Sequence, residues 1–335
     1  MATHAKLEKQ VKKKISSLLQ PYEFHINQFN EFFKKELRSR VKIVDKIANY
    51  IVKRKGKQFR PILVLLSGLA SGEANENLYR AATVVELIHS ATLVHDDVID
   101  ESFQRRGFPA IQLIWKNKVA VLMGDYLLSK SLIIATETQN LEFMNLISNV
   151  AKEMSQGELL QIEKSRKLNI DMDQYFKMIS YKTASLISAC CEIGALVVGA
   201  DKEHQQALKE YGLLLGQAFQ IKDDLLDYEG NTELLGKPVV NDLQDKKITL
   251  PLLYAFESLS DNEIKRIKRL IKKGISSKEA DEIITIVKST GGLDKAKAKA
   301  EELVREANEK LQILPPCDAR DTLSQIADYV IHRNK

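Results

Sequence analysis

The chain contains two copies of one acidic pentapeptide, and each copy lies inside an apolar run that fits a helix. This repeat limits the possible fold and function of the chain more than any other feature. The first copy, DDVID, spans residues 96–100, and the second, DDLLD, spans residues 223–227. On a helix, residues i and i+4 lie on the same face one turn apart. Like charges held that close repel each other unless a cation neutralises them. One copy alone could be a solvated helix face, but two copies among apolar residues predict a metal-dependent site.

The kind of metal follows from the ligand atoms. Carboxylate oxygens are hard ligands, and magnesium binds through one or two carboxylates while it keeps positions for substrate phosphates. Asp96 shares a helix face with Asp100, and Asp223 shares one with Asp227. We therefore expect magnesium at these motifs, together with a phosphorylated substrate.

Helical patterns dominate the rest of the chain. Apolar residues repeat with a helical period over 7–18 and again over 303–311. The segment SSKE at 276–279 has the pattern of a capping box before an apolar run. No segment alternates with a period of two, and no linker rich in proline, glycine or serine divides the chain. We predict a single all-α domain over 1–335, an antiparallel helical bundle whose acidic motifs face each other across a central cavity.

Composition and the termini limit the classes of protein to which the chain can belong. It has 50 Lys and Arg against 45 Asp and Glu, a net charge of +5, which does not imply nucleic acid as a partner. The N-terminus lacks the apolar core of a secretory signal, and the apolar stretch 61–70 is too short to span a bilayer. The 3 cysteines give no disulfide or zinc framework. We expect a cytoplasmic protein.

Lysines at 9–14 form a basic stripe on the predicted first helix. The first interpretation of this stripe is a helix face exposed to solvent, and the second is weak attraction of the helix to a membrane surface.

Four basic clusters accompany the acidic motifs. They are GKQFRP at 56–61, RRG at 105–107, KT at 182–183, and a loop with GKP at 236–238 and KK at 246–247. Arginine binds phosphate oxygens with a planar fork, whereas lysine acts as a mobile point charge. Any single lysine here is better explained as an ordinary surface charge. The arginine pair is not, because it follows directly on a metal-ligand motif.

The ordered set of motifs closely resembles the trans-isoprenyl diphosphate synthases, the polyprenyl synthetase family, and most of all its long-chain octaprenyl and polyprenyl diphosphate synthases. The resemblance covers nearly the whole chain and rests on GKQFRP, IHSATLVHDDVIDESFQRRG, GDYLLS, YKTASL, GQAFQIKDDLLD, LGKPVVNDL, KKITLPLLYA and ADYVIHRNK. It implies the all-α isoprenoid synthase fold, a homodimer and three magnesium ions per active site. The implied reaction is a head-to-tail condensation of isopentenyl diphosphate with an allylic diphosphate primer.

The resemblance also implies roles for individual residues. The first acidic motif and the arginine after it would hold the allylic diphosphate through magnesium, and the second motif a further magnesium ion. The metal ligands would be Asp96, Asp100 and Asp223. The residues that act in catalysis would be Asp96, Asp97, Asp100, Asp223, Asp224, Asp227, Lys182 and Lys237. Isopentenyl diphosphate would be bound by Lys57, Arg60, His89 and Arg106. The allylic diphosphate would be bound by Arg105, Lys182, Thr183, Gln220, Lys237 and Lys247.

The chain departs from the family pattern at Lys55 and Val240, where glycine is usual. Valine resists the positive φ that glycine adopts, so residue 240 bears on the closed geometry of the 229–247 loop, a predicted lid. Phe219 precedes the second acidic motif and could stabilise an allylic cation with its ring. His95, next to the first motif, is better explained as a packing residue or as a residue that supports the metal ligands.

Residues before the first acidic motif predict the length of the product. Thr92 and Ala91 are small, whereas short-chain members of the family have a bulky aromatic residue near this point. Ile88 and Leu87 lie one turn further back, aliphatic and able to line a tunnel. Since one isoprene unit spans about one helical turn, we expect a product of about six to ten units, with about eight as the best single value.

Three alternatives stay open. A short-chain farnesyl or geranylgeranyl diphosphate synthase would need its tunnel closed by another helix. A class I terpene cyclase usually has one aspartate-rich motif and no second diphosphate site, so Lys57, Arg60 and Arg106 argue against it. A non-catalytic subunit of a heteromeric synthase typically lacks aspartates in one motif, and here both motifs are intact.

Overall fold

The computed structural model describes residues 17–333 except 55, 57, 106 and 230–240. Helices make up most of these residues, and the predicted all-α class is confirmed. Several sequence predictions lie outside the described residues. They concern most of the N-terminal helix over 7–18, the lysine stripe at 9–14, most of the 229–247 loop, and Lys55, Lys57, Arg106, Lys237 and Val240.

Among the described residues, the first part of the chain contains a series of helices and one small hairpin. They are η1 (Gln20–Tyr22), α2 (Glu23–Glu36), α3 (Lys42–Lys53), α4 (Phe59–Ser71), α5 (Glu76–Ile99), β1 (Gln104–Arg105), β2 (Phe108–Pro109), α6 (Ile111–Trp115), α7 (Asn117–Glu137) and α8 (Leu141–Lys167). In the antiparallel hairpin, Gln104 lies opposite Pro109 and Arg105 opposite Phe108. The sequence does not predict this hairpin, because strands of two residues are too short to show an alternating pattern.

In the second part of the chain, all regular secondary structure among the described residues is helical. Its elements are α9 (Met172–Ile179), the π-helical turn η2 (Ser180–Ala184), α10 (Ser185–Val197), α11 (Lys202–Glu229), α13 (Asn241–Gln244), α14 (Leu250–Phe256), α15 (Asp261–Lys273), α16 (Ser277–Ser289), α17 (Gly292–Lys310), η3 (Leu311–Ile313) and α18 (Asp318–His332). The capping box predicted at 276–279 is confirmed, since Ser276 and Glu279 bond to each other's backbone N–H at the start of α16. In the predicted periodicity over 303–311, Leu303 and Ala307 are buried in α17 and Leu311 is buried at the start of η3.

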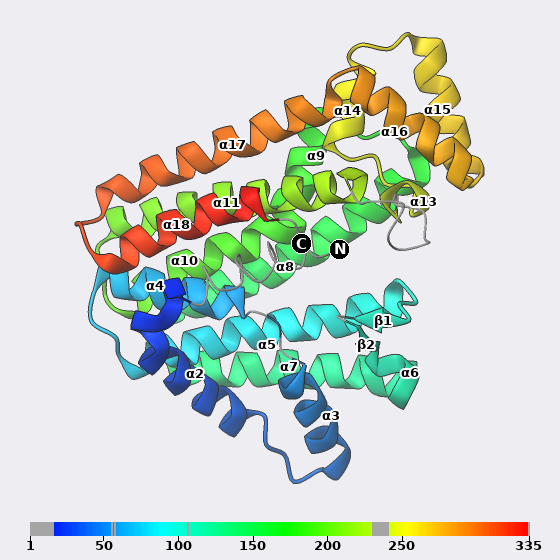
Figure 1. Cartoon of the computed structure of the whole chain (residues 1–335). Coiled ribbons are helices and arrows are strands. Elements are labelled where there is room, and N and C mark those ends of the chain that lie inside the picture. The colour runs from blue at the N-terminus through cyan, green and yellow to red at the C-terminus, as the bar shows by residue number, and fades with distance from the viewer. Residues whose placement is uncertain (1–16, 55, 57, 106, 230–240, 334–335) are drawn as a thin grey trace.

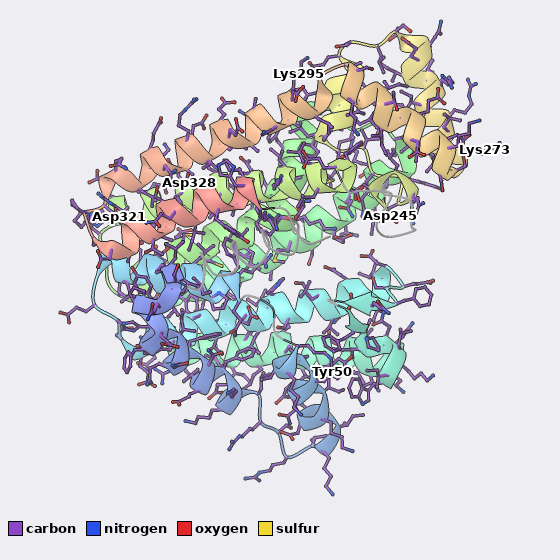
Figure 2. All side chains as sticks on the ribbon, in the orientation of Figure 1. Tyr50, Asp245, Lys273, Lys295, Asp321 and Asp328 are labelled. Carbon is purple, nitrogen blue, oxygen red and sulfur yellow. The ribbon has the colours of Figure 1, made fainter. Side chains whose placement is uncertain are left out.

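The helices are arranged in layers. Figure 1 shows α5 and α7 side by side in one layer, with α10 and α11 in the next and α17 above α11. Helix α18 packs against α4, α11 and α17. Helix α4 packs against α5 of the first layer and against α10 of the next. Nine of its 13 residues are buried, as expected of a short helix that is apolar on nearly every side. In Figure 2, Lys273 at the end of α15 and Asp321 in α18 lie at opposite ends of the molecule.

Helix α7 has the length and composition of a segment that could cross a membrane, the one helix among the described residues that does. The buried share of its most apolar stretch is 39%. A core helix of a soluble protein passes the same test. The apolar stretch 61–70, the longest run in the sequence, falls inside the shorter helix α4.

Candidate active site

Both acidic motifs lie at the C-terminal ends of long helices. Helix α5 ends at Ile99, and the N–H of Asp100 donates to the carbonyl oxygen of Asp96 at 2.8 Å. The second motif occupies the last turns of α11. In Figure 1, the C-terminal ends of both helices point toward the end of the molecule that carries the hairpin and α13. The C-terminal end of a helix carries partial negative charge, so carboxylates placed there strengthen the attraction for a cation.

Lys247 connects the surroundings of the two motifs. Its ammonium donates to Asp245 at 2.9 Å and lies 3.6 Å from an oxygen of Asp242. Burial by itself lowers the pKa of Lys247, but the nearby carboxylates of Asp245, Asp242 and Asp100 outweigh burial and raise the pKa overall. Because Asp100 belongs to the first motif and Asp242 lies beside the second, both motifs share one electrostatic environment.

Asp224 is the buried member of the second motif. It is 3% exposed and accepts hydrogen bonds from the Tyr175 hydroxyl at 2.6 Å and from Gln220 Nε2 at 3.0 Å. Burial and the charge of Asp242 raise the pKa of Asp224 to about 8. A carboxyl with this pKa holds a proton at neutral pH unless a cation lies beside it. Asp227 accepts a hydrogen bond from the backbone N–H of Asp242 at 3.1 Å, which fixes α13 against the end of α11.

Asp223, a predicted metal ligand, is held by an arginine from the C-terminus. Arg333 Nη2 lies 2.5 Å from Asp223 Oδ1 and also donates to the carbonyl oxygen of Phe219 at 3.2 Å. Loss of hydration raises the pKa of Asp223, and Arg333 opposes that rise. The Arg333 guanidinium lies 3.9 Å from the centre of the Phe219 ring, which also stacks on Phe59. The role predicted for Phe219 beside an allylic cation therefore requires Arg333 to move.

The predicted allylic ligands Lys182 and Thr183 lie in the π-helical turn η2. Lys182 forms an ion pair with Glu158 at 2.5 Å and donates to Gln161 at 3.0 Å, whereas the Thr183 hydroxyl donates to Gln220 at 2.8 Å. Single π-turns inside helices often occur at functional sites. Here the turn presents two adjacent residues to the same space as the second acidic motif.

Glycines on the neighbouring helices allow η2 to lie this close. A Cβ on Gly157 of α8 would lie 2.5 Å from the backbone nitrogen of Lys182, and a Cβ on Gly216 of α11 would lie 2.5 Å from the Cα of Ala184. Any larger residue at either position would push the turn away. The backbone position of Lys182 thus depends on close approach from two sides.

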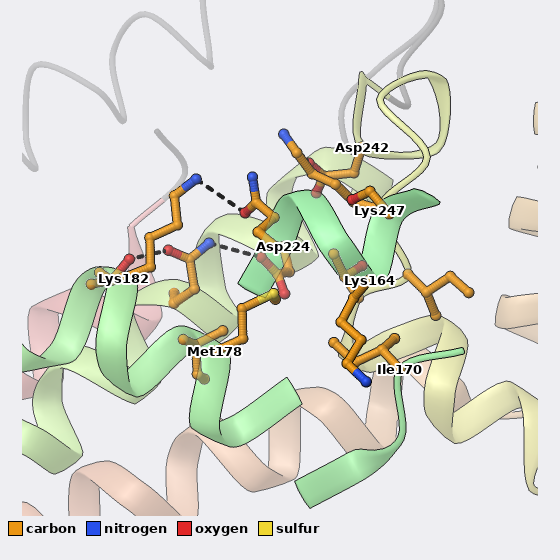
Figure 3. Close-up of a pocket in the computed structure, with 14 residues that line it drawn as sticks. Lys164, Ile170, Met178, Lys182, Asp224, Asp242 and Lys247 are labelled. Carbon is orange, nitrogen blue, oxygen red and sulfur yellow. Dashed lines mark hydrogen bonds and ion pairs between the residues drawn. The ribbon is translucent and has the colours of Figure 1, made fainter. Parts of the chain in front are cut away.

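One cavity is lined by described residues of the predicted allylic site. It has a volume of about 120 Å³, and Figure 3 shows Lys182 and Lys247 around Asp224 within it. Its lining includes four of the predicted allylic ligands, Lys182, Thr183, Gln220 and Lys247. The backbone of Arg105 lies in β1, and Lys237 is outside the described residues.

A second cavity, of about 400 Å³, contains the described part of the predicted isopentenyl diphosphate site. Arg60 at the start of α4 and His89 on α5 line it, and Arg60 Nη1 lies 3.0 Å from His89 Nε2. Phe219 and Arg333 also line this cavity. The charge of Arg60 also opposes the rise in the pKa of Asp223, so this cavity lies near the second acidic motif.

The remaining sequence-predicted residues lie on α5. Asp97 is 3% exposed, and its carbonyl oxygen accepts a hydrogen bond from Gln112 at 2.7 Å. Leu87, Ile88 and Ala91, three of the four predicted chain-length residues, are buried. Thr92, the fourth, is partly buried, with its hydroxyl bonded to the carbonyl oxygen of His89 at 2.9 Å. Their effect on product length stays a prediction. His95 contacts the carbonyl oxygen of Val121 at 3.1 Å, in keeping with a packing role.

The comparison with known proteins decides the family. The family model "Polyprenyl synthetase" matches residues 41–287. The chain belongs to the polyprenyl synthetase family. It is 33% identical over 317 residues to an all-trans-nonaprenyl-diphosphate synthase (geranyl-diphosphate specific) of Rhodobacter capsulatus, which covers 94% of this chain and 97% of that protein. It is 36% identical over 295 residues to a geranylgeranyl diphosphate synthase of Methanosarcina mazei, which covers 86% of this chain and 89% of that protein.

A solved structure agrees with the fold. The polyprenyl synthase from Caulobacter crescentus, complexed with calcium and isoprenyl diphosphate, has a TM-score of 0.88 and 33% sequence identity to this chain. The similarity covers 96% of this chain and 98% of that protein. As a member of the polyprenyl synthetase family, the chain is a trans-prenyl diphosphate synthase, a prenyltransferase.

The donor atoms of this polyprenyl synthetase suit a divalent cation that substrate phosphates help to bind. Among the described residues, no group of three or more histidine, cysteine or acidic side chains converges enough to hold a metal ion by itself. Magnesium needs only one or two carboxylates when phosphate oxygens complete its coordination. Carboxylates at two helix C-termini are therefore a fitting donor set.

Four residues of this site were not predicted from the sequence. Asp242 and Arg333 lie in LGKPVVNDL and ADYVIHRNK, segments that carry the family resemblance, so their signal was present. Glu158 and Tyr175 come from α8 and α9, where no motif marks them. They partner Lys182 and Asp224, and only the packed structure brings them there.

Proposed function

We propose that the chain is a magnesium-dependent, head-to-tail prenyltransferase that extends an allylic diphosphate with isopentenyl diphosphate. The observation that carries this proposal is the presence of two separate basic groups, in two cavities that both include residues of α11. One group, with Lys182 and Lys247, surrounds Asp224. The other, Arg60 with His89, lies in the second cavity near Asp223. Two diphosphate substrates need two such groups, whereas a cyclase of one diphosphate needs one.

The reaction divides into steps that these residues can assist. The bond between C1 and oxygen of the allylic diphosphate breaks, the double bond of isopentenyl diphosphate attacks C1, and a proton then leaves the new chain. Magnesium bound by Asp96, Asp100 and Asp223 would supply Lewis-acid stabilisation of the leaving diphosphate. Lys182 and Lys247 neutralise charge on the same leaving group. No side chain stands out as the base, and by family precedent the departing diphosphate accepts the proton.

We further propose a long-chain, all-trans product of about six to ten isoprene units, with about eight as the best single value. Small residues at Ala91 and Thr92, followed by the aliphatic Ile88 and Leu87, support this length. A short-chain product is the second candidate, favoured by the 36% identity to a geranylgeranyl diphosphate synthase.

A homodimer is also proposed, and an exposed apolar face of α7 supports it. Val121, Leu122, Leu132 and Ile133 on this helix are 41%, 58%, 38% and 53% exposed. Exposed apolar residues gathered on one helix often mark an interface. Sedimentation of the purified protein should show a dimer, and Leu122→Glu combined with Ile133→Glu should shift it to a monomer. A wild-type monomer that is stable and active would contradict the proposal.

We also propose that the protein is located in the cytoplasm. Its lipid product must leave the enzyme, so we propose that the protein contacts a membrane loosely when the product is released.

Incorporation of labelled isopentenyl diphosphate into an organic-soluble product tests the reaction class. The purified protein should incorporate the label only when an allylic primer and magnesium are both present. A chelator should abolish incorporation, and added magnesium should restore it. Conversion of an allylic diphosphate to a cyclic hydrocarbon without isopentenyl diphosphate would contradict the proposal. So would the absence of incorporation with every primer offered.

A further inference from the structure

A cluster of aromatic rings around Arg54 joins the end of α3 to the small hairpin. The guanidinium carbon of Arg54 lies 3.4 Å from the centre of the Tyr50 ring and 4.5 Å from the centre of the Phe108 ring. The Tyr50 hydroxyl donates a hydrogen bond of 2.6 Å to the carbonyl oxygen of Pro109. Figure 2 labels Tyr50 where α3 approaches the layer of α5 and α7. We call Tyr50, Arg54 and Phe108 the aromatic clamp.

The clamp connects two segments that are predicted to bind the same substrate. On one side, Arg54 directly follows α3 and precedes the GKQFRP segment, which contains Arg60. On the other side, Phe108 lies opposite Arg105 in the hairpin, and Arg106 follows Arg105 in the sequence. The predicted isopentenyl diphosphate site takes basic residues from both segments, so its geometry depends on how the two are held together.

The clamp also borders residues of the first acidic helix. A small, largely apolar cavity of about 80 Å³ lies beside Tyr50, Arg54 and Phe108. His89 and Asp97 of α5 line the same cavity. Movement of the hairpin away from α3 would therefore open this cavity next to a predicted substrate ligand and a residue of the first acidic motif.

We propose that the aromatic clamp positions the isopentenyl diphosphate site by fixing the hairpin relative to the GKQFRP segment. This inference rests on the proposed function. A planar guanidinium stacks on aromatic rings, whereas a lysine ammonium is a compact and strongly hydrated charge, so the two are not interchangeable at a stacked site. Arg54 is thus a positioning residue, and its effect should depend on stacking rather than on charge alone.

Steady-state kinetics of three variants test the stacking. Arg54→Met, Arg54→Lys and Phe108→Leu should each raise the KM for isopentenyl diphosphate about five-fold or more, with kcat within about two-fold of wild type. The double variant Arg54→Met with Phe108→Leu should be little worse than either single one, because both remove the same contact. A wild-type KM in Arg54→Lys would overturn the proposal, since charge alone would then suffice. Fully additive effects would also overturn it.

Arg80→Met provides the matched control. The Arg80 guanidinium lies 6.0 Å from the centre of the Phe32 ring, on the N-terminal part of α5, whereas the hairpin follows the C-terminal end of that helix. The same loss of a cation over a ring should leave both KM values unchanged there. If Arg80→Met raised the KM for isopentenyl diphosphate as much as Arg54→Met, the effect would be general destabilisation and the proposal would fail.

The fluorescence of Trp115 gives a readout that does not depend on turnover. Trp115 is the only tryptophan in the chain, and its ring centre lies 5.1 Å from that of Tyr50 in an edge-on contact. Titration with isopentenyl diphosphate, without primer, should change the Trp115 emission of the wild type. In Arg54→Met the midpoint should move to a concentration about five-fold higher or more. An unchanged emission in a wild type that elongates primers would overturn the proposal.

These experiments separate the inference from the proposed function. A wild type that incorporates isopentenyl diphosphate, together with Arg54 variants of normal KM, contradicts the clamp alone. A wild type that never incorporates isopentenyl diphosphate and never binds it in the Trp115 titration contradicts both. The thermal unfolding temperature of each variant should stay within a few degrees of that of wild type. Any change in KM would then result from a local shift of the substrate site and not from general destabilisation.

Discussion

Arg333 lies 2.5 Å from Asp223 through a charge-assisted hydrogen bond, although 110 positions separate them in the chain. The arginine is 11% exposed, and it also covers the ring of Phe219. In this arrangement a cation from the C-terminus already neutralises an aspartate that is expected to bind magnesium. Metal binding at Asp223 must then compete with Arg333.

Arg333→Gln should tighten magnesium binding in the absence of substrate. The variant removes the competing cation, and charge-assisted hydrogen bonds contribute about 1.5–3 kcal/mol. Calorimetric titration should show a magnesium dissociation constant several-fold lower than that of wild type. Arg320→Gln, at the start of α18, should bind magnesium as wild type does and serves as the control. Unchanged or weaker binding by Arg333→Gln would show that the two cations do not compete.

Stability of the metal-free protein should fall as the pH rises toward and through about 8. The pKa of Asp224 is raised from 3.8 to about 8. A group whose pKa is raised by folding contributes stability that is complete below 3.8 and is lost as the pH rises through about 8. Denaturant unfolding at pH values of about 5 and 9, with a chelator present, measures this loss. Asp224→Asn should show a smaller loss between the two pH values, and an equal loss would contradict the assignment.

Asp96→Ala and Asp223→Ala should each lower the turnover rate by several orders of magnitude. Each removes a carboxylate that helps to stabilise charge in the transition state, a contribution of several kcal/mol. The fold should survive in Asp96→Ala, because a like charge leaves an acidic cluster, whereas Asp223→Ala also removes the carboxylate partner of Arg333 and should lower stability. Initial rates with both substrates, and circular dichroism of each variant, provide the check. If either variant retained more than about a tenth of wild-type turnover, the metal-site assignment would be wrong.

Gly157→Ala should impair the allylic site from a distance. Alanine normally favours a helix over glycine by about 0.5–1 kcal/mol, but here its Cβ would lie 2.5 Å from the backbone nitrogen of Lys182. The turn η2 must shift, and overpacking of this kind costs about 1–3 kcal/mol. The KM for the allylic primer should rise more than that for isopentenyl diphosphate. Ser155→Ala, on the exposed face of the same helix, should leave both constants unchanged.

Local patterns account for what the sequence predicts well. The helices, the capping box at 276–279 and the positions of the acidic motifs depend on residues within a few turns of one another. The contacts that complete the site join distant segments, such as Arg333 with Asp223 and Tyr50 with Pro109. No periodicity encodes such pairs. The π-helical turn also escapes sequence patterns, because it results from close packing against Gly157 and Gly216.

Ala91→Phe should shorten the product without abolishing activity. Ala91 is 2% exposed on α5, five residues before the first aspartate of the motif. A bulky ring there should block elongation after about three or four units and leave the metal ligands in place. Chromatography of the dephosphorylated products, compared with those of wild type, provides the measurement. Products of wild-type length would remove Ala91 from the path of the growing chain.

The length of the wild-type product tests the central claim most directly. Purified protein is incubated with labelled isopentenyl diphosphate, a short allylic primer and magnesium, and the dephosphorylated products are separated by chromatography. The account predicts a main product of about six to ten isoprene units, formed only with magnesium and both substrates. A wild-type product that stops at about three or four units would contradict the tunnel along α5, and no product at all would contradict the proposed reaction.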